Sequence, residues 1–123
     1  MRTCVIIPAY NESTAIAGLI NQIIKSGLEA MVIDDGSVDD TAKIASSCGA
    51  QVLIQPKNMG KGAALIKGYK FALEKGYDAV ISMDGDWQHS SDDLPAFVRK
   101  AQVSSSALII GNRMGMTRRM PFL

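Results

Sequence analysis

The chain has 123 residues, the size of one domain, and its 47% hydrophobic and 20% charged residues exclude disordered and collagen-like classes. Thirteen Lys and Arg residues against twelve Asp and Glu residues leave a net charge of +1, which gives no electrostatic footprint for nucleic acid. Cys4 and Cys48 are the only cysteines and indicate neither a disulfide framework nor a zinc site. No apolar run approaches the roughly 20 residues of a membrane span, so we expect a soluble, cytoplasmic domain.

Short runs of β-branched residues alternate with longer segments of helical periodicity. The pattern predicts strands at residues 3–7, 31–33, 51–54, 79–83 and 107–110. It predicts helices at residues 15–26, 39–48, 61–75 and 94–102. We expect Pro8 to end the first strand, because proline cannot donate to a ladder, and Gly27, Gly49 and Gly76 to end the first three helices.

The alternation of apolar strands with helices predicts an α/β fold with a mostly parallel sheet, helices on both faces and right-handed crossovers. Ligands in such sheets bind beyond the carboxyl ends of the strands, where the strand order reverses. In a 3-2-1-4 order the first and fourth strands are neighbours at that point. Asp34, Asp35, Asp84 and Asp86 would then crowd one edge, which favours a hard divalent cation shared with substrate phosphates.

Each of these segments also has a purely structural explanation. Residues 34–37 fit a turn in which Ser37 or Asp39 caps the next helix. Residues 58–62 fit a plain glycine loop, because they match neither the Walker A pattern nor GxGxxG, although Lys57 and Lys61 could meet phosphate or base oxygens. The segment that starts at Asp84 begins like a calcium loop but lacks its later ligands.

In combination the segments indicate one protein family more specifically than any of them does alone. The succession IIPAYNE, IDDGSVDDT, NMGKGAAL, MDGDWQH and GNRM resembles the donor-binding half of family 2 glycosyltransferases, which have the GT-A fold. Within that family the chain is most similar to the branch of dolichyl-phosphate mannose synthases and bacterial polyprenyl-phosphate sugar transferases. The resemblance covers nearly the whole chain. It implies a Rossmann-like GT-A fold and a single nucleotide-sugar-binding domain over residues 1–123, the N-terminal part of a catalytic domain.

The resemblance also implies a role for each matched residue. The nucleotide is expected to contact Pro8, Tyr10, Glu12, Asp35, Lys61 and Asp84. Among these, the first three would line the base and ribose pocket, and Asp35 would accept a hydrogen bond from the base, with Asp34 and Ser37 shaping the turn. The metal, Mg²⁺ or Mn²⁺, is expected to be held by Asp84, Asp86 and Gln88. Asp86 and Arg113 are the expected catalytic residues, because a metal and an arginine stabilise a leaving diphosphate where its charge develops.

The implied reaction is inverting transfer of a sugar from GDP-mannose or a UDP-sugar to a polyprenyl or dolichyl phosphate. Family members usually extend beyond this length, so the resemblance implies a chain truncated at its C-terminus that binds donor but transfers sugar poorly or not at all. An apolar edge is expected where the remaining half would pack, which leaves a homodimer open. Membrane association of a full-length protein is left open as well.

Three other interpretations remain at this stage. A sugar nucleotidyltransferase would carry a glycine-rich loop after the first strand, where PAYNE stands. A receiver-type signalling domain would place a lysine after the fifth strand, whereas no lysine follows Lys100. A non-catalytic nucleotide-binding remnant, acting as a subunit of something larger, is the third.

Overall fold

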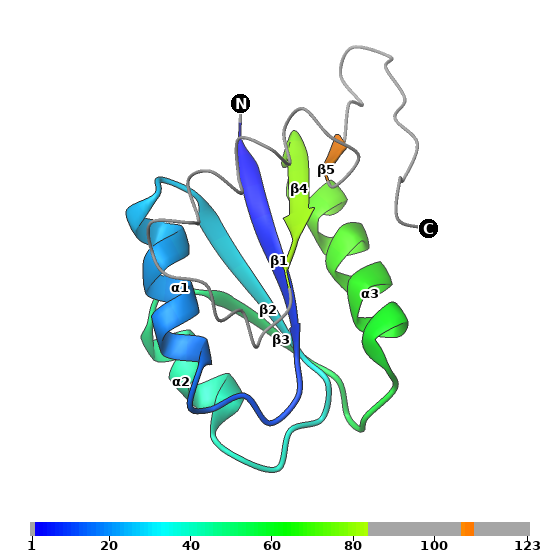
Figure 1. The fold of residues 1–123 in the computed structure, drawn as a ribbon. Helices are drawn as coiled ribbons and strands as arrows, with labels where there is room; N and C mark the ends of the chain where they lie inside the picture. Colours follow the sequence, from blue (N-terminus) through cyan, green and yellow to red (C-terminus); the bar gives the residue numbers. More distant parts are fainter. Residues whose placement is uncertain (1, 84–106, 110–123) are drawn as a thin grey trace.

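A computed structural model describes residues 2–83 and 107–109 of the chain (Figure 1). Within these ranges one sheet has the strand order β3-β2-β1-β4-β5. The strands are β1 (Thr3–Ala9), β2 (Glu29–Asp34), β3 (Gln51–Ile54), β4 (Ala79–Ser82) and β5 (Ala107–Ile109). The helices are α1 (Ile16–Lys25), α2 (Thr41–Ser47) and α3 (Lys61–Glu74).

The sheet topology confirms the expected 3-2-1-4 order and the parallel pairing of the first four strands. β5 differs, because it pairs with β4 in the antiparallel direction. A short apolar run reads the same in either direction, and many mostly parallel sheets carry one antiparallel edge strand, so sequence pattern alone does not fix this orientation. The predicted helix at residues 94–102 lies outside the described residues.

Pro8 does not end the first strand, contrary to the prediction; β1 continues to Ala9. The carbonyl of Ile6 accepts a hydrogen bond from Met83 on the β4 side, and Pro8, two residues later, faces the same side. The described pairing of β1 with β4 ends at Ile6, so the N–H that Pro8 lacks interrupts no described pair on that side. On its other side the strand still pairs with β2.

Helices cover both faces of the sheet, with α1 and α2 on one face and α3 on the other (Figure 1). β1 runs through the middle, and its side chains alternate between the two layers as the pleat requires. Val5 and Ile7 pack in the cluster beneath α1 and α2, whereas Cys4 and Ile6 pack beneath α3. All four side chains are fully buried, so both halves of the core depend on this strand.

Each described helix ends at the glycine that the sequence indicates. Gly27, Gly49 and Gly76 all have a positive φ. At the end of α1 the N–H of Gly27 donates to the carbonyl of Ile24 at 2.9 Å, and the N–H of Leu28 donates to that of Ile23 at 3.2 Å. This paired arrangement satisfies carbonyls that the helix leaves open. In the part of the chain that the structure describes, no helix is long and apolar enough to cross a membrane.

α3 packs against the sheet through one face of the helix. Its periodicity predicts Leu65, Tyr69, Ala72 and Leu73 on the buried face. Tyr69 and Ala72 are buried and Leu65 is partly buried, whereas Leu73 is 46% exposed. The other buried positions are Ala64 and Gly68, which have little or no side chain. A Cβ at Gly68 would lie 2.8 Å from Cγ2 of Ile6, so the helix backbone approaches β1 too closely for any side chain there.

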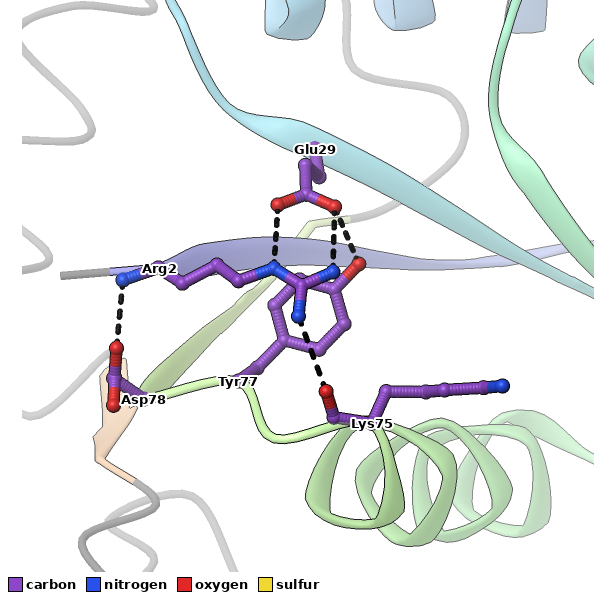
Figure 2. A network of polar contacts seen from close by, with 5 residues as sticks. All are labelled: Arg2, Glu29, Lys75, Tyr77 and Asp78. Carbon is purple, nitrogen blue, oxygen red and sulfur yellow. Dashed lines mark hydrogen bonds and ion pairs between the residues drawn. The ribbon is translucent and has the colours of Figure 1, made fainter.

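A polar network fastens the amino ends of the strands (Figure 2). The Arg2 guanidinium lies over the Tyr77 ring and makes two hydrogen bonds to Glu29, one of them a 3.0 Å ion pair. It also donates to the carbonyl of Lys75 at the end of α3, while the Tyr77 hydroxyl donates to Glu29 at 2.6 Å. The backbone N–H of Arg2 donates to Asp78. The segments that precede β1 and β4 are thereby joined to the first residue of β2 and the end of α3.

We expect Gly68→Ala to lower the free energy of unfolding by about 1–3 kcal/mol, because the new methyl group overpacks against Ile6. Gly18→Ala is the matched control: it lies in α1 with nothing within 4 Å of a Cβ, and should raise stability by about 0.5–1 kcal/mol. Urea unfolding of both variants tests this. Equal effects of the two substitutions would contradict the close approach of α3.

We expect the stabilising effect of Glu29 to depend on pH. Hydrogen bonds from Arg2 and then Tyr77 hold the pKa of the Glu29 carboxyl below its usual range. Its contribution is therefore present above the unfolded pKa of about 4.3 and is lost as the pH falls through the folded pKa. Glu29→Gln should lower the melting temperature at pH 7 but have a much smaller effect near pH 3, with Glu74→Gln as the exposed control. An equal effect of Glu29→Gln at both pH values would contradict this role.

Candidate nucleotide-binding site

Three loops meet at the carboxyl edge of the sheet, after β1, β2 and β3 (Figure 1). They comprise residues 10–15, 35–40 and 55–60. The hydrogen bond from Met83 to Ile6, 3.0 Å long, carries β1–β4 pairing one residue past the end of β4. This edge contains the reversal point between β1 and β4, which is where ligands of such sheets bind.

The Asp35 carboxylate joins the β2–α2 loop to the start of α3. Its two oxygens accept the backbone N–H of Met59 at 2.8 Å and that of Gly60 at 2.9 Å. Gly60 is the N-cap of α3, so a buried negative charge lies at the positive end of this helix. Sequence pattern does not predict this contact, because the partners are backbone groups 24 and 25 residues away.

The next residue brings the same two loops into direct contact. Gly36 has a φ of 79°, and a Cβ there would lie 2.6 Å from both the N of Asn58 and the carbonyl carbon of Lys57. Only glycine accepts both this conformation and this proximity. The turn around it is closed by Asp34, whose Oδ1 accepts the Ser37 N–H at 3.1 Å, as the turn interpretation of this segment predicts.

Short polar side chains fasten the β1–α1 loop to the β2–α2 loop. Three successive backbone N–H groups of the first loop, those of Asn11, Glu12 and Ser13, donate to side chains of the second loop and of the first residue of α2. The acceptors are Ser37 Oγ at 2.8 Å, Thr41 Oγ1 at 2.9 Å and Asp39 Oδ2 at 3.3 Å. In return, the side-chain oxygen of Asn11 accepts the Val38 N–H at 2.9 Å.

Asp39 performs part of the capping role that the sequence suggests. It accepts hydrogen bonds from the hydroxyl and the N–H of Thr41, the first residue of α2, and these and the bonds from Ser13 hold its pKa below the usual range. Ser37 does not cap α2, because its hydroxyl oxygen faces Asn11. Neither Asn11 nor Thr41 was a predicted site residue. Both are short polar residues near the ends of strands, which is typical of residues that make loop contacts. Sequence pattern does not predict which segment each of them contacts.

The structure brings the predicted nucleotide-binding residues of the described part to this one edge. Pro8 is half-buried in β1, Tyr10 is 46% exposed, Glu12 is partly buried, Asp35 is buried, and Lys61 is exposed as the first residue of α3. Asp84, Asp86, Gln88 and Arg113 lie outside the described residues. Where the structure describes side chains, no three of the residue types His, Cys, Asp and Glu gather to hold a metal ion.

Comparison with known proteins decides the family. Residues 4–118 match the model of glycosyl transferase family 2. The chain belongs to this family. The match includes all of the predicted metal-binding and catalytic positions from Asp84 to Arg113. It decides against the receiver-type and nucleotidyltransferase interpretations.

Two relatives illustrate the similarity in sequence. Undecaprenyl-phosphate mannosyltransferase of Micrococcus luteus is 33% identical over 92% of this chain and 49% of the relative. UDP-N-acetylglucosamine–dolichyl-phosphate N-acetylglucosaminyltransferase of Methanococcus voltae is 30% identical over 89% of this chain and 51% of the relative. The chain thus spans about half the length of the curated relatives it matches.

The solved structures agree on the fold. Glucosyl-3-phosphoglycerate synthase of Mycobacterium tuberculosis, in complex with Mn²⁺, UDP and glucosyl-3-phosphoglycerate, superposes with a TM-score of 0.66 at 28% identity. The match covers 84% of this chain and 40% of that one. The chain has the Rossmann-like GT-A fold, as the resemblance implies.

We expect Asp35→Asn to destabilise the fold by about 1–3 kcal/mol, because the buried amide group would turn a donor toward one of the two N–H groups that Asp35 accepts. Asp40→Asn is the matched control: Asp40 is exposed and makes no side-chain capping bond, so its substitution should change stability by less than about 0.5 kcal/mol. Urea unfolding gives both values. Hydrogen exchange at Met59 and Gly60 should accelerate in Asp35→Asn only; unchanged exchange there would contradict the bridge.

Proposed function

We propose that this chain binds the nucleotide diphosphate of a GDP- or UDP-sugar for a glycosyltransferase that uses a polyprenyl or dolichyl phosphate acceptor. The observation that supports the proposal is that Tyr10, Glu12, Asp35 and Lys61 all follow strands at the carboxyl edge of a family 2 sheet, the edge that contains the reversal point. The names of two relatives specify undecaprenyl-phosphate and dolichyl-phosphate chemistry, and the solved relative contains UDP and Mn²⁺.

The nucleoside is assigned to the β1 and β2 loops. The N–H of Asp35 donates to the carbonyl of Ala9 at 2.8 Å, so Tyr10 and Asp35 leave neighbouring strands side by side. An exposed aromatic ring provides a stacking surface for a base. A carboxylate has about four acceptor positions, so Asp35 retains capacity for a base N–H while it accepts the two N–H groups from the β3–α3 loop. Pro8 and Glu12 complete this proposed wall.

The diphosphate is assigned to Lys61, Asp84, Asp86, Gln88 and Arg113. Carboxylate and amide oxygens are the donors that a hard divalent cation prefers, so the predicted metal set fits Mg²⁺ or Mn²⁺. Such an ion would supply positive charge to the diphosphate. Arg113 would add a bidentate hydrogen-bond donor to the same group.

The proposed transfer proceeds with inversion at the anomeric carbon. An oxygen of the acceptor phosphate forms the new bond to that carbon while the bond to the diphosphate oxygen breaks, and the electron pair leaves with the nucleotide. The acceptor phosphate is already ionised at neutral pH, so it needs little general-base assistance. Because this chain spans about half of its relatives, we assign donor binding to it and transfer to the whole protein.

Calorimetric titration of GDP and UDP, each with and without Mn²⁺, tests the proposal. We expect one nucleotide to bind at least tenfold more tightly than the other, and its affinity to fall at least tenfold without metal or in Asp86→Ala. Glu74→Ala, at the far end of α3, is the control and should bind as the unsubstituted protein does.

Absence of binding under all four conditions would contradict donor binding by this chain. Binding by a chain extended to the length of the relatives would then show that further residues complete the pocket. A longer form that also fails would favour the non-catalytic remnant.

A further inference from the structure

Asn11 has an unusual backbone in the middle of the PAYNE segment. Its φ is 54°, and among the described residues it is the only one besides glycines with a positive φ. Asparagine tolerates this left-handed conformation better than most residues with a side chain. Its two neighbours, Tyr10 and Glu12, are both assigned to the nucleotide pocket. The conformation of Asn11 therefore sets the direction in which the chain leaves Tyr10 and enters Glu12.

The side chain of Asn11 also locks that conformation against the second loop. Its Oδ1 accepts the Val38 N–H at 2.9 Å, while its own N–H donates to Ser37 Oγ at 2.8 Å. These two bonds run in opposite directions between the same pair of loops. The N–H groups of Glu12 and Ser13 also donate to side chains of Thr41 and Asp39. Asn11 differs from these two contacts in contributing both its backbone and its side chain.

The position of this contact separates it from the core. Asn11 is exposed and Val38 is 87% exposed, so neither belongs to the clusters that pack beneath the helices. Loss of an exposed hydrogen bond costs a fold little, whereas the geometry of a binding loop depends directly on it. A substitution here should consequently affect ligand binding more than unfolding.

We propose that Asn11 is a positioning residue that holds Tyr10 and Glu12 in register with Asp35 for the nucleotide, an inference that rests on the proposed function. Asn11 does not itself contact the ligand in this assignment. It acts through two features, its tolerance of a positive φ and its acceptor oxygen. These features can be separated by substitution, because glycine tolerates a positive φ but has no acceptor oxygen.

The test measures the Kd of the preferred nucleotide with Mn²⁺, together with the melting temperature, for Asn11→Ala, Asn11→Gly and Asn11→Asp. We expect Asn11→Ala to weaken binding about 10-fold or more and Asn11→Gly by a smaller factor, with melting temperatures within a few degrees of the unsubstituted protein. Asn11→Asp keeps an acceptor for Val38 and should recover most of the affinity. Asn21→Ala, an exposed asparagine on α1, is the matched control and should leave Kd unchanged.

Hydrogen exchange without nucleotide provides a second readout. The Val38 amide should exchange faster in Asn11→Ala and Asn11→Gly, and at the original rate in Asn11→Asp. If the unsubstituted protein binds nucleotide and Asn11→Ala binds equally well, the positioning role of Asn11 is wrong and the proposed function stands. If the unsubstituted protein binds neither nucleotide, the proposed function fails and the nucleotide role of Asn11 fails with it. Unchanged exchange at Val38 would overturn the loop contact itself.

Discussion

The Asp35 carboxylate is the contact on which the carboxyl edge of this sheet depends. A carboxylate as buried as this one is stable only where hydrogen bonds replace its hydration, and here both oxygens receive a backbone N–H from the segment that starts α3. One side chain therefore satisfies the N–H of the N-cap residue of α3 and that of the residue before it, and it fixes β2 against the β3–α3 loop. Gly36 allows this arrangement, because any larger residue would push that loop away.

The β2–α2 loop is the central member of the three. On one side it holds the β3–α3 loop through Asp35 and Gly36, and on the other it holds the β1–α1 loop through Ser37, Asp39 and Thr41. Loops connected in this way are ordered before a ligand arrives, which reduces the ordering cost of binding. The amino edge of the sheet is held differently, by the exposed Arg2 guanidinium and its ion pair with Glu29. Because salt screens exposed charges, it should weaken the amino edge more than the carboxyl edge.

The sequence was sufficient for the features that follow from local pattern. The strand order, the two-sided helical cover and the helix ends at Gly27, Gly49 and Gly76 could all be predicted. It was insufficient where a contact joins backbone to a distant side chain, as between Asp35 and the start of α3, or where a ladder has already ended, as beside Pro8. Motif spacing placed the candidate residues at one edge of the sheet. The hydrogen bonds that hold them there could not be predicted, because they follow no repeating pattern in the sequence.

The occupied start of α3 also bears on how an anion would be held. Many doubly wound sheets place a pyrophosphate on the N–H groups at a helix N-terminus, through a glycine-rich loop. In this chain the N–H groups of Met59 and Gly60 already have a negative partner in Asp35. Under the proposed function we assign neutralisation of the diphosphate to a metal ion and to cationic side chains. The residues predicted for this are Asp84, Asp86 and Gln88 for the metal, and Lys61 and Arg113 for the diphosphate. Leu65 stands where a dinucleotide-binding chain has its third glycine, although both kinds of chain use the same reversal point of the sheet.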